Sequence, residues 1–220
     1  VVSLRDLERI SRERTAKDMW DFIDGAAFDE ISKRRNKSKF EELTLNPSYL
    51  IDVANRDLST TVLGENISFP VMIAPAGGQR QHHPKGELAT SIGTGMADTL
   101  YTLPTSSGYS IEEVAQVATG PLWFQLYHSD DEITEYLVKR AKLAGYSAIC
   151  LTVDVPTYGA KEKDLRNDFK RIDNLHNGSL RDRPAYLKRK DVGPRDFADW
   201  ETTGYSGLTW ERLDWLKSLT

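Results

Sequence analysis

The stretch that decides the fold begins with Leu122-Trp-Phe-Gln-Leu-Tyr127 and ends with Ser147-Ala-Ile-Cys-Leu-Thr-Val-Asp154. Between these two apolar runs lies an amphipathic segment from Asp130 to Ala144, followed by Gly145. The segment has the length and period of a helix, and glycine is the residue that most easily adopts the positive φ of a helix C-terminus. A strand, a helix and a strand in this order predict a βαβ unit with two parallel strands.

The same rhythm extends toward the N-terminus. Val71-Met-Ile-Ala-Pro75 has the composition of a buried strand, a helical pattern runs from Pro84 to Ala97, and Thr99 to Leu103 is a second strand pattern. Ser110 and Glu113 have the spacing of a capping box before the next helix. Strands alternating with helices predict an α/β fold with a parallel sheet, which is either half of a closed barrel or a small open sheet.

We expect these elements to form one domain over residues 1–220. The expected division is helices and a cap over 1–70, βα units 1–4 over 71–154, a long excursion without a convincing strand over 155–208, and a last helix over 209–219, capped by Thr209. An irregular stretch as long as the excursion is usually functional or disordered.

Composition excludes several classes of protein. With 29 basic and 33 acidic residues the net charge is -4, which gives no reason to expect a nucleic-acid partner. No apolar run approaches the roughly 18 residues of a transmembrane helix. Residues 161–195 carry 11 basic and 6 acidic side chains, so this segment is a candidate for peripheral contact with a membrane surface or an anionic partner, although a solvated excursion is the commoner reading.

The cysteine and histidines do not predict a metal site. The single cysteine, Cys150, lies in an apolar run and is interpreted as core packing, which suits a reducing, cytoplasmic location. His82 and His83 are adjacent and therefore splay apart, with no third ligand at a suitable spacing. We expect His128 and His176 to face solvent.

Candidate binding residues gather at the carboxyl ends of the expected strands, where parallel α/β sheets hold their ligands. Gln125 and Tyr127 are two residues apart on one strand, so they face the same side. Either alone could be an ordinary interior polar residue, but their position at successive strand ends favours a site. The small residues after the first strand allow close approach of a flat ligand. The residues to inspect are Pro75-Ala76-Gly77-Gly78, Pro104-Thr105-Ser106, Gln125, Tyr127, Thr152 and Asp154.

Several blocks, in this order and spacing, resemble the FMN-dependent α-hydroxy acid dehydrogenases and oxidases, which include glycolate and lactate oxidases, mandelate dehydrogenase and the flavin domain of flavocytochrome b2. They include Asp21-Phe22-Ile-Asp-Gly25, Pro70-Val-Met-Ile-Ala-Pro75, His83-Pro84-Lys-Gly86-Glu87, Trp123-Phe-Gln-Leu-Tyr127, Leu151-Thr152-Val153-Asp154-Val-Pro156 and Gly159-Ala-Lys161-Glu162-Lys-Asp164.

The resemblance implies an FMN-binding TIM (β/α)₈ barrel, of which this chain supplies the N-terminal helices and about the first four βα units. The implied reaction oxidises a small L-2-hydroxy acid to a 2-oxo acid and passes electrons to oxygen, a quinone or another acceptor, commonly in a homo-oligomer. The implied roles are backbone contact with the flavin from Pro75, Ala76 and Gly77, a flavin position at Pro104, hydrogen bonds to the flavin from Gln125 and Thr152, and substrate binding by Phe22, Gly77, Tyr127 and Lys161, with Tyr127 catalytic.

The sequence departs from the family pattern at three of these positions. Phe22 stands where the family has a Tyr, Lys161 replaces an Arg that binds carboxylate through two hydrogen bonds, and Pro104 replaces a Ser. The histidine base of the family matches none of the four histidines, so we expect it to lie outside these residues, on a longer polypeptide or a second chain. The alternatives are a diverged or incomplete homologue with an altered substrate, and a non-enzymatic half-barrel that pairs with another chain.

Overall fold

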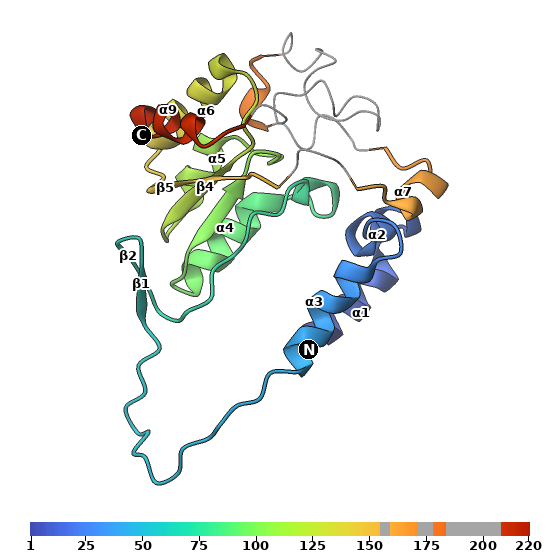
Figure 1. Cartoon of the computed structure of the whole chain (residues 1–220), viewed down its shortest axis with the longest axis vertical. Helices are drawn as coiled ribbons and strands as arrows, with labels where there is room; N and C mark the ends of the chain where they lie inside the picture. Colours follow the sequence, from blue (N-terminus) through green and yellow to red (C-terminus); the bar gives the residue numbers. More distant parts are fainter. Residues whose placement is uncertain (155–158, 171–177, 184–207) are drawn as a thin grey trace. The chain divides into compact units, whose positions relative to one another are not determined.

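The computed structural model describes residues 1–154, 159–170, 178–183 and 208–220. The chain, coloured by residue number in Figure 1, divides into two compact units. Unit 1 comprises Val1–Arg56 with Gly159–Arg171, and unit 2 comprises Asp57–Tyr158 with Ile172–Thr220. Each unit has its own contacts and is described by itself.

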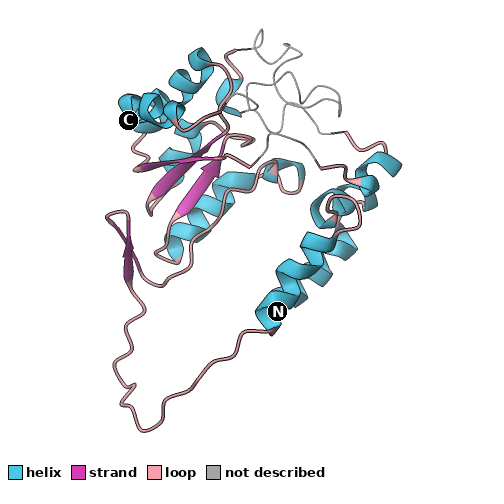
Figure 2. Ribbon diagram, in the orientation of Figure 1, coloured by secondary structure: helices cyan, strands magenta, loops and turns pink. Residues whose placement is uncertain are grey.

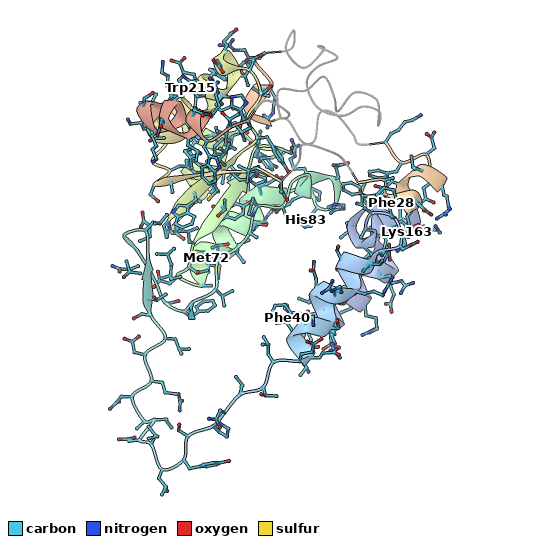
Figure 3. All side chains as sticks on the ribbon, in the orientation of Figure 1. Phe28, Phe40, Met72, His83, Lys163 and Trp215 are labelled. Atoms are coloured by element: carbon cyan, nitrogen blue, oxygen red, sulfur yellow. The ribbon has the colours of Figure 1, made fainter. Side chains whose placement is uncertain are left out.

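Unit 1 is helical, as expected for residues 3–42. Its helices are α1 (Leu4–Arg14), α2 (Lys17–Asp24), α3 (Ile31–Glu41) and α7 (Glu162–Arg166). Helix α7 packs against α2, and its Lys163, labelled in Figure 3, forms ion pairs with the carboxylates of Asp24 (3.3 Å) and Glu30 (3.1 Å). The pKa of Asp24 is lowered mainly by a hydrogen bond from Lys33, and the pKa of Glu30 mainly by the backbone N–H of Ala26. Lys163 contributes to lowering both.

The excursion expected to lack a convincing strand contains helical structure in its described part. Helix α7 and the 3-10 turn η3 (Gly178–Leu180) both lie within 155–208. Helix α7 is short and highly charged, so it shows no apolar periodicity, and its ion pairs with α2 and α3 residues stabilise it instead. Much of the excursion, including His176, lies outside the described residues.

Unit 2 contains a three-stranded parallel sheet, drawn in magenta in Figure 2. The strands are β3 (Tyr101–Pro104), β4 (Leu122–Leu126) and β5 (Ala148–Leu151), in the order β3-β4-β5. Helix α5 (Ile111–Val117) connects the first pair and helix α6 (Asp131–Leu143) connects the second. The register aligns Pro104 with Gln125 and Gln125 with Cys150. The predicted βαβ units over 99–154 are confirmed.

The strand predicted over 71–75 is present only as an isolated bridge. Ile73 pairs in parallel with Tyr101, donates its N–H to Leu100 O and accepts from Thr102 N–H. Val71 is 53% exposed and Met72 is 40% exposed, so the run is not buried as expected. Within the described residues, the run at 71–75 pairs with a strand on one side only. A strand of a parallel sheet becomes buried only when other elements also cover both of its faces.

The sheet has two different faces. Leu122, Phe124 and Leu126 pack into the main core with residues of α4 (Gly86–Met96), α5, α6 and α9 (Glu211–Leu219). Trp123 faces the other way, toward Leu100 and Ile67. Ile67 belongs to the hairpin of β1 (Thr60–Val62) and β2 (Glu65–Ile67), whose two-residue turn has positive φ at Leu63 and Gly64.

The helix caps follow the sequence signals with one exception. Ser110 and Glu113 form the predicted capping box of α5, Asp130 caps α6, and Gly145 has a φ of 86°. The N-cap of α9 is Trp210 and not Thr209, whose hydroxyl bonds the Glu211 carboxylate instead. A further element in the described part of the chain is the 3-10 turn η1 (Gln79–Gln81).

Candidate functional site

The carboxyl ends of β3, β4 and β5 bring two predicted flavin-binding residues into direct contact. The Gln125 amide donates from Nε2 to Thr152 Oγ1 at 2.7 Å. Its oxygen, Oε1, accepts the backbone N–H of Thr105 at 3.0 Å. Gln125 is 4% exposed, so these bonds form where an unpaired amide would be costly. The two polar side chains are a connected pair at the expected edge of the sheet.

Thr105 contacts β4 through its side chain as well. Its hydroxyl donates to the carbonyl oxygen of Gln125 at 2.6 Å and accepts the Tyr127 backbone N–H at 3.0 Å. Thr105 lies among the candidate strand-end residues, although no specific role was predicted for it. Pro104, the last residue of β3, is buried and has neither an N–H nor a hydroxyl to donate. Thr105 is therefore the residue of this loop that organises the end of β4.

The loop after the isolated bridge carries Pro75, Ala76 and Gly77, which are all exposed. Gly78 donates its backbone N–H to Ser106 O at 3.0 Å, which ties this loop to the loop after β3. A Cβ added at Gly77 would lie 3.0 Å from Ser106 Cβ and 3.2 Å from Ser106 O. The close approach of the two loops therefore already favours glycine at position 77, whatever ligand binds there.

A buried carboxylate that the sequence analysis missed holds the same two loops. Glu87, in the first turn of α4, is fully buried, and its Oε1 accepts the backbone N–H groups of Gln79 (3.2 Å) and Gly108 (3.1 Å). Gly108 O in turn accepts Arg80 Nη1 at 3.0 Å. Burial raises the pKa of Glu87, and these hydrogen bonds oppose the rise. In the sequence, Glu87 looks like an ordinary first-turn acid, so no signal marked it as buried.

The predicted substrate residues of unit 1 also meet. The Lys161 ammonium lies 4.5 Å from the centre of the Phe22 ring and donates to Phe22 O at 2.6 Å. On its other side, the Phe22 ring stacks on Phe169 with 4.6 Å between ring centres. Lys161 also lies 3.6 Å from the Asp164 carboxylate. A cation held against an aromatic ring is a compact single charge, unlike the planar fork of an arginine.

The expectation that His128 faces solvent is wrong. His128 is 8% exposed, its ring lies edge-on to Trp215 with centres 6.1 Å apart, and its Nε2 lies 3.2 Å from Arg212 Nη2. Figure 3 shows Trp215 on α9, which covers this position from a distant part of the sequence. His128 therefore belongs to the packing between the end of β4 and α9.

Cys150 and the other histidines give no sign of a metal centre. Cys150 is half-buried against the Ile67, Leu100 and Trp123 cluster, and burial raises the pKa of its thiol, which suits packing. Burial also lowers the pKa of His82. Among the residues that the structure describes, no three His, Cys, Asp or Glu side chains gather as metal ligands. Nor is any helix of that part long and apolar enough to cross a membrane.

Parallel strands connected by helices define an α/β protein, and comparison with known proteins gives its family. The model of the FMN-dependent dehydrogenase family matches residues 11–220. The chain belongs to this family, whose members are FMN-dependent.

The similar proteins are longer than this chain. It is 38% identical to glycolate oxidase 3 of Arabidopsis thaliana and 37% identical to an L-lactate oxidase of Nostoc sp., in both cases over 100% of this chain but only 60% and 62% of the relative. Among solved structures, a soluble mutant of the membrane-associated (S)-mandelate dehydrogenase from Pseudomonas putida has a TM-score of 0.88 at 32% identity, over 100% of this chain and 62% of that one. The chain therefore spans about 60% of the length of the curated relatives it matches.

Proposed function

We propose that this chain forms part of an FMN-dependent enzyme that oxidises a small L-2-hydroxy acid to a 2-oxo acid and passes the electrons to oxygen, a quinone or another acceptor. The observation that carries the proposal is the Gln125–Thr152 pair at the carboxyl edge of a parallel sheet in a chain of this family. The names of the relatives, glycolate, lactate and mandelate oxidases or dehydrogenases, support the substrate class.

We further infer that the sheet is part of a TIM barrel, to which the chain contributes its N-terminal helices (1–70) and βα units (71–154). Helices cover one face of the sheet. By the alternation of residues along each strand, Trp123, Gln125 and Thr152 occupy positions on the opposite face. In a barrel that second face is the interior, and its carboxyl end is where ligands bind. The likeness to a mandelate oxidase, with a TM-score of 0.85, supports this inference.

The donor set of the sheet edge fits FMN. Thr152 accepts a hydrogen bond from Gln125, so its own hydroxyl hydrogen can point to a ligand, and Gln125 keeps a second Nε2 hydrogen. The polar edge of a flavin ring carries carbonyl oxygens, which need such donors. When bound, FMN supplies the acceptor for the two electrons of the alcohol. Exposed backbone at Pro75, Ala76 and Gly77 would lie against the ring, and Pro104 would contact it without donating.

The substrate would be held by the remaining predicted residues. We propose that the Tyr127 hydroxyl polarises the substrate oxygen, since Tyr127 follows Gln125 on the same side of β4. Phe22 and Lys161 are proposed to bind the substrate's carboxylate end, with Lys161 supplying a positive charge. The proton acceptor of the reaction is proposed to lie outside the residues described. A cytoplasmic location, a homo-oligomer and peripheral contact through 161–195 also remain proposals.

The protein expressed from its complete gene should bind FMN and reduce it with a 2-hydroxy acid. The expected result is a yellow protein with flavin absorption bands that bleach when glycolate, L-lactate or (S)-mandelate is added without oxygen. The measurement is anaerobic absorption spectroscopy with release and identification of the bound flavin. A protein that neither retains nor rebinds FMN would favour the non-enzymatic half-barrel.

Phe22 and Lys161 favour a second candidate function, that of an FMN-dependent enzyme with an altered substrate. Lysine cannot bind a carboxylate through two parallel hydrogen bonds, and phenylalanine offers no hydroxyl. If the site has been rebuilt for another acid, the double variant Phe22→Tyr/Lys161→Arg should raise kcat/KM for L-lactate or (S)-mandelate by about tenfold or more, the equivalent of one regained hydrogen bond to a charged group. Steady-state kinetics on both acids, with each single variant as the control, measure this gain. No gain on either acid would remove the support for an altered substrate.

A further inference from the structure

We infer that Thr105 is the residue that positions two side chains of the candidate site, Gln125 of β4 and Tyr127, which follows the end of that strand. The inference rests on the proposed function, because it assigns to Thr105 the placement of groups that would contact FMN and substrate. Thr105 itself acts through these neighbours and is a positioning residue. Its three hydrogen bonds to β4 are the observations that carry the inference.

The hydroxyl of Thr105 fixes the backbone at the end of β4. The pairing of β3 with β4 ends at Pro104 and Gln125. Just beyond, the Thr105 hydroxyl donates to Gln125 O and accepts from Tyr127 N–H. A hydroxyl has one hydrogen to donate, so this group is committed to the backbone on both sides of Leu126. It therefore sets the direction in which the side chains of Gln125 and Tyr127 leave the strand.

The backbone N–H of Thr105 fixes which way the Gln125 amide faces. An N–H can only donate, so the amide atom 3.0 Å from it must be the oxygen. The amide nitrogen is then directed to Thr152 Oγ1, 2.7 Å away. Thr152 receives this hydrogen and keeps its own for an acceptor. With the amide reversed, the pair would lose the contact with Thr105 and present an oxygen in place of a donor.

Thr105 is itself held from the far side of its loop. Ser106 O accepts the N–H of Gly78 at 3.0 Å, and Gly108 N–H donates to the buried Glu87 carboxylate at 3.1 Å. These contacts involve neither Gln125 nor Tyr127. The loop is therefore fixed independently of the groups it positions, which is what preorganisation of a binding site requires.

The test compares two substitutions of Thr105 in the protein expressed from its complete gene. Valine has the shape of threonine without the hydroxyl, and serine keeps the hydroxyl. In a fluorescence titration of each apoprotein with FMN, Thr105→Val is expected to weaken binding by about tenfold and Thr105→Ser by less than about twofold, because only the former leaves two backbone groups without their partner. Thr94→Val is the matched control, since Thr94 is 5% exposed and its hydroxyl bonds Thr90 O within α4 at 2.8 Å. Its FMN affinity should equal that of the wild type.

Crystal structures of the wild-type and Thr105→Val apoproteins separate this inference from the proposed function. The variant is expected to show Gln125 and Tyr127 displaced and the Gln125–Thr152 contact lengthened or reversed. Wild-type FMN affinity in Thr105→Val overturns the inference, as does an equal loss in the Thr94→Val control. If the wild type itself binds no FMN, the proposed function fails, and the crystal structures alone test the positioning role of Thr105. Unmoved Gln125 and Tyr127 side chains in the variant would overturn that role, whereas their displacement would support it.

Discussion

Replacing Glu87 with leucine is expected to lower the free energy of unfolding by about 2–6 kcal/mol, because one buried and one half-buried backbone N–H group lose their acceptor at a cost of about 1–3 kcal/mol each. Those groups belong to Gln79 and Gly108, and both bond the same carboxylate oxygen. Leucine has nearly the volume of glutamate, so a cavity contributes little. Urea denaturation of the complete protein, followed by circular dichroism, measures the loss.

Glutamine at this position is the matched control. It keeps an oxygen for the two N–H groups and carries no charge. Burial raises the pKa of Glu87, so between its ordinary value of 4.5 and its higher native pKa the folded state binds more protons than the unfolded chain. Wild-type stability therefore falls as pH rises through this window. Glu87→Gln does not titrate, so its stability relative to the wild type should increase from about pH 4 to pH 8. A constant difference across that range, or an unaltered stability of Glu87→Leu, would contradict this account.

The elements that the sequence predicted best are those whose signals are local. Strand β4, helix α6 and strand β5 follow from apolar runs, a cap at Asp130 and a positive-φ glycine at Gly145. Each signal concerns residues within one or two turns, so no distant contact is needed to read it. The pairing of Gln125 with Thr152 was also within reach, since both lie at carboxyl ends of neighbouring parallel strands.

The predictions that failed depend on contacts between distant residues. His128 was expected to face solvent, yet Trp215 and Arg212, more than 80 positions later, cover its ring. No role was predicted for Glu87, since only its contact with the loop at Gly108 makes it a buried acceptor. The run at 71–75 has the composition of a buried strand, but its pairing requires neighbours that composition cannot supply. Local pattern predicts the elements, whereas burial of a polar group is decided by what packs over it.

Thr105 illustrates the same limit within the site. The resemblance directed attention to position 104, where proline replaces a family serine. The structure instead gives the organising hydrogen bonds to the next residue, whose hydroxyl serves the backbone of Gln125 and Tyr127. A threonine at position 105, next to the position where the family has serine, matches no motif that a single sequence would reveal. The role we infer for it follows from its three hydrogen bonds to Gln125 and Tyr127.

Replacing Gln125 with leucine is expected to weaken FMN binding by about 100-fold, which corresponds to roughly 3 kcal/mol. The leucine side chain removes the hydrogen-bond donor proposed for the flavin edge, and it leaves the Thr105 N–H without its acceptor. It also releases the Thr152 hydroxyl, which could then rotate away from the ligand. Equilibrium titration of the apoprotein with FMN measures the change, and thermal unfolding of the same apoprotein reports the structural cost.

Gln125→Glu distinguishes the donor role from the structural one. A glutamate keeps an oxygen facing the Thr105 N–H, and at neutral pH it has no hydrogen to give to Thr152 or to a flavin. If Gln125 acts as a donor, the glutamate variant should lose FMN binding about as severely as the leucine variant while retaining more of the apoprotein's thermal stability. If the amide matters only for packing the end of β4, the glutamate variant should bind FMN nearly as well as the wild type. That result would assign the Gln125–Thr152 pair to the fold and remove it from the proposed flavin site.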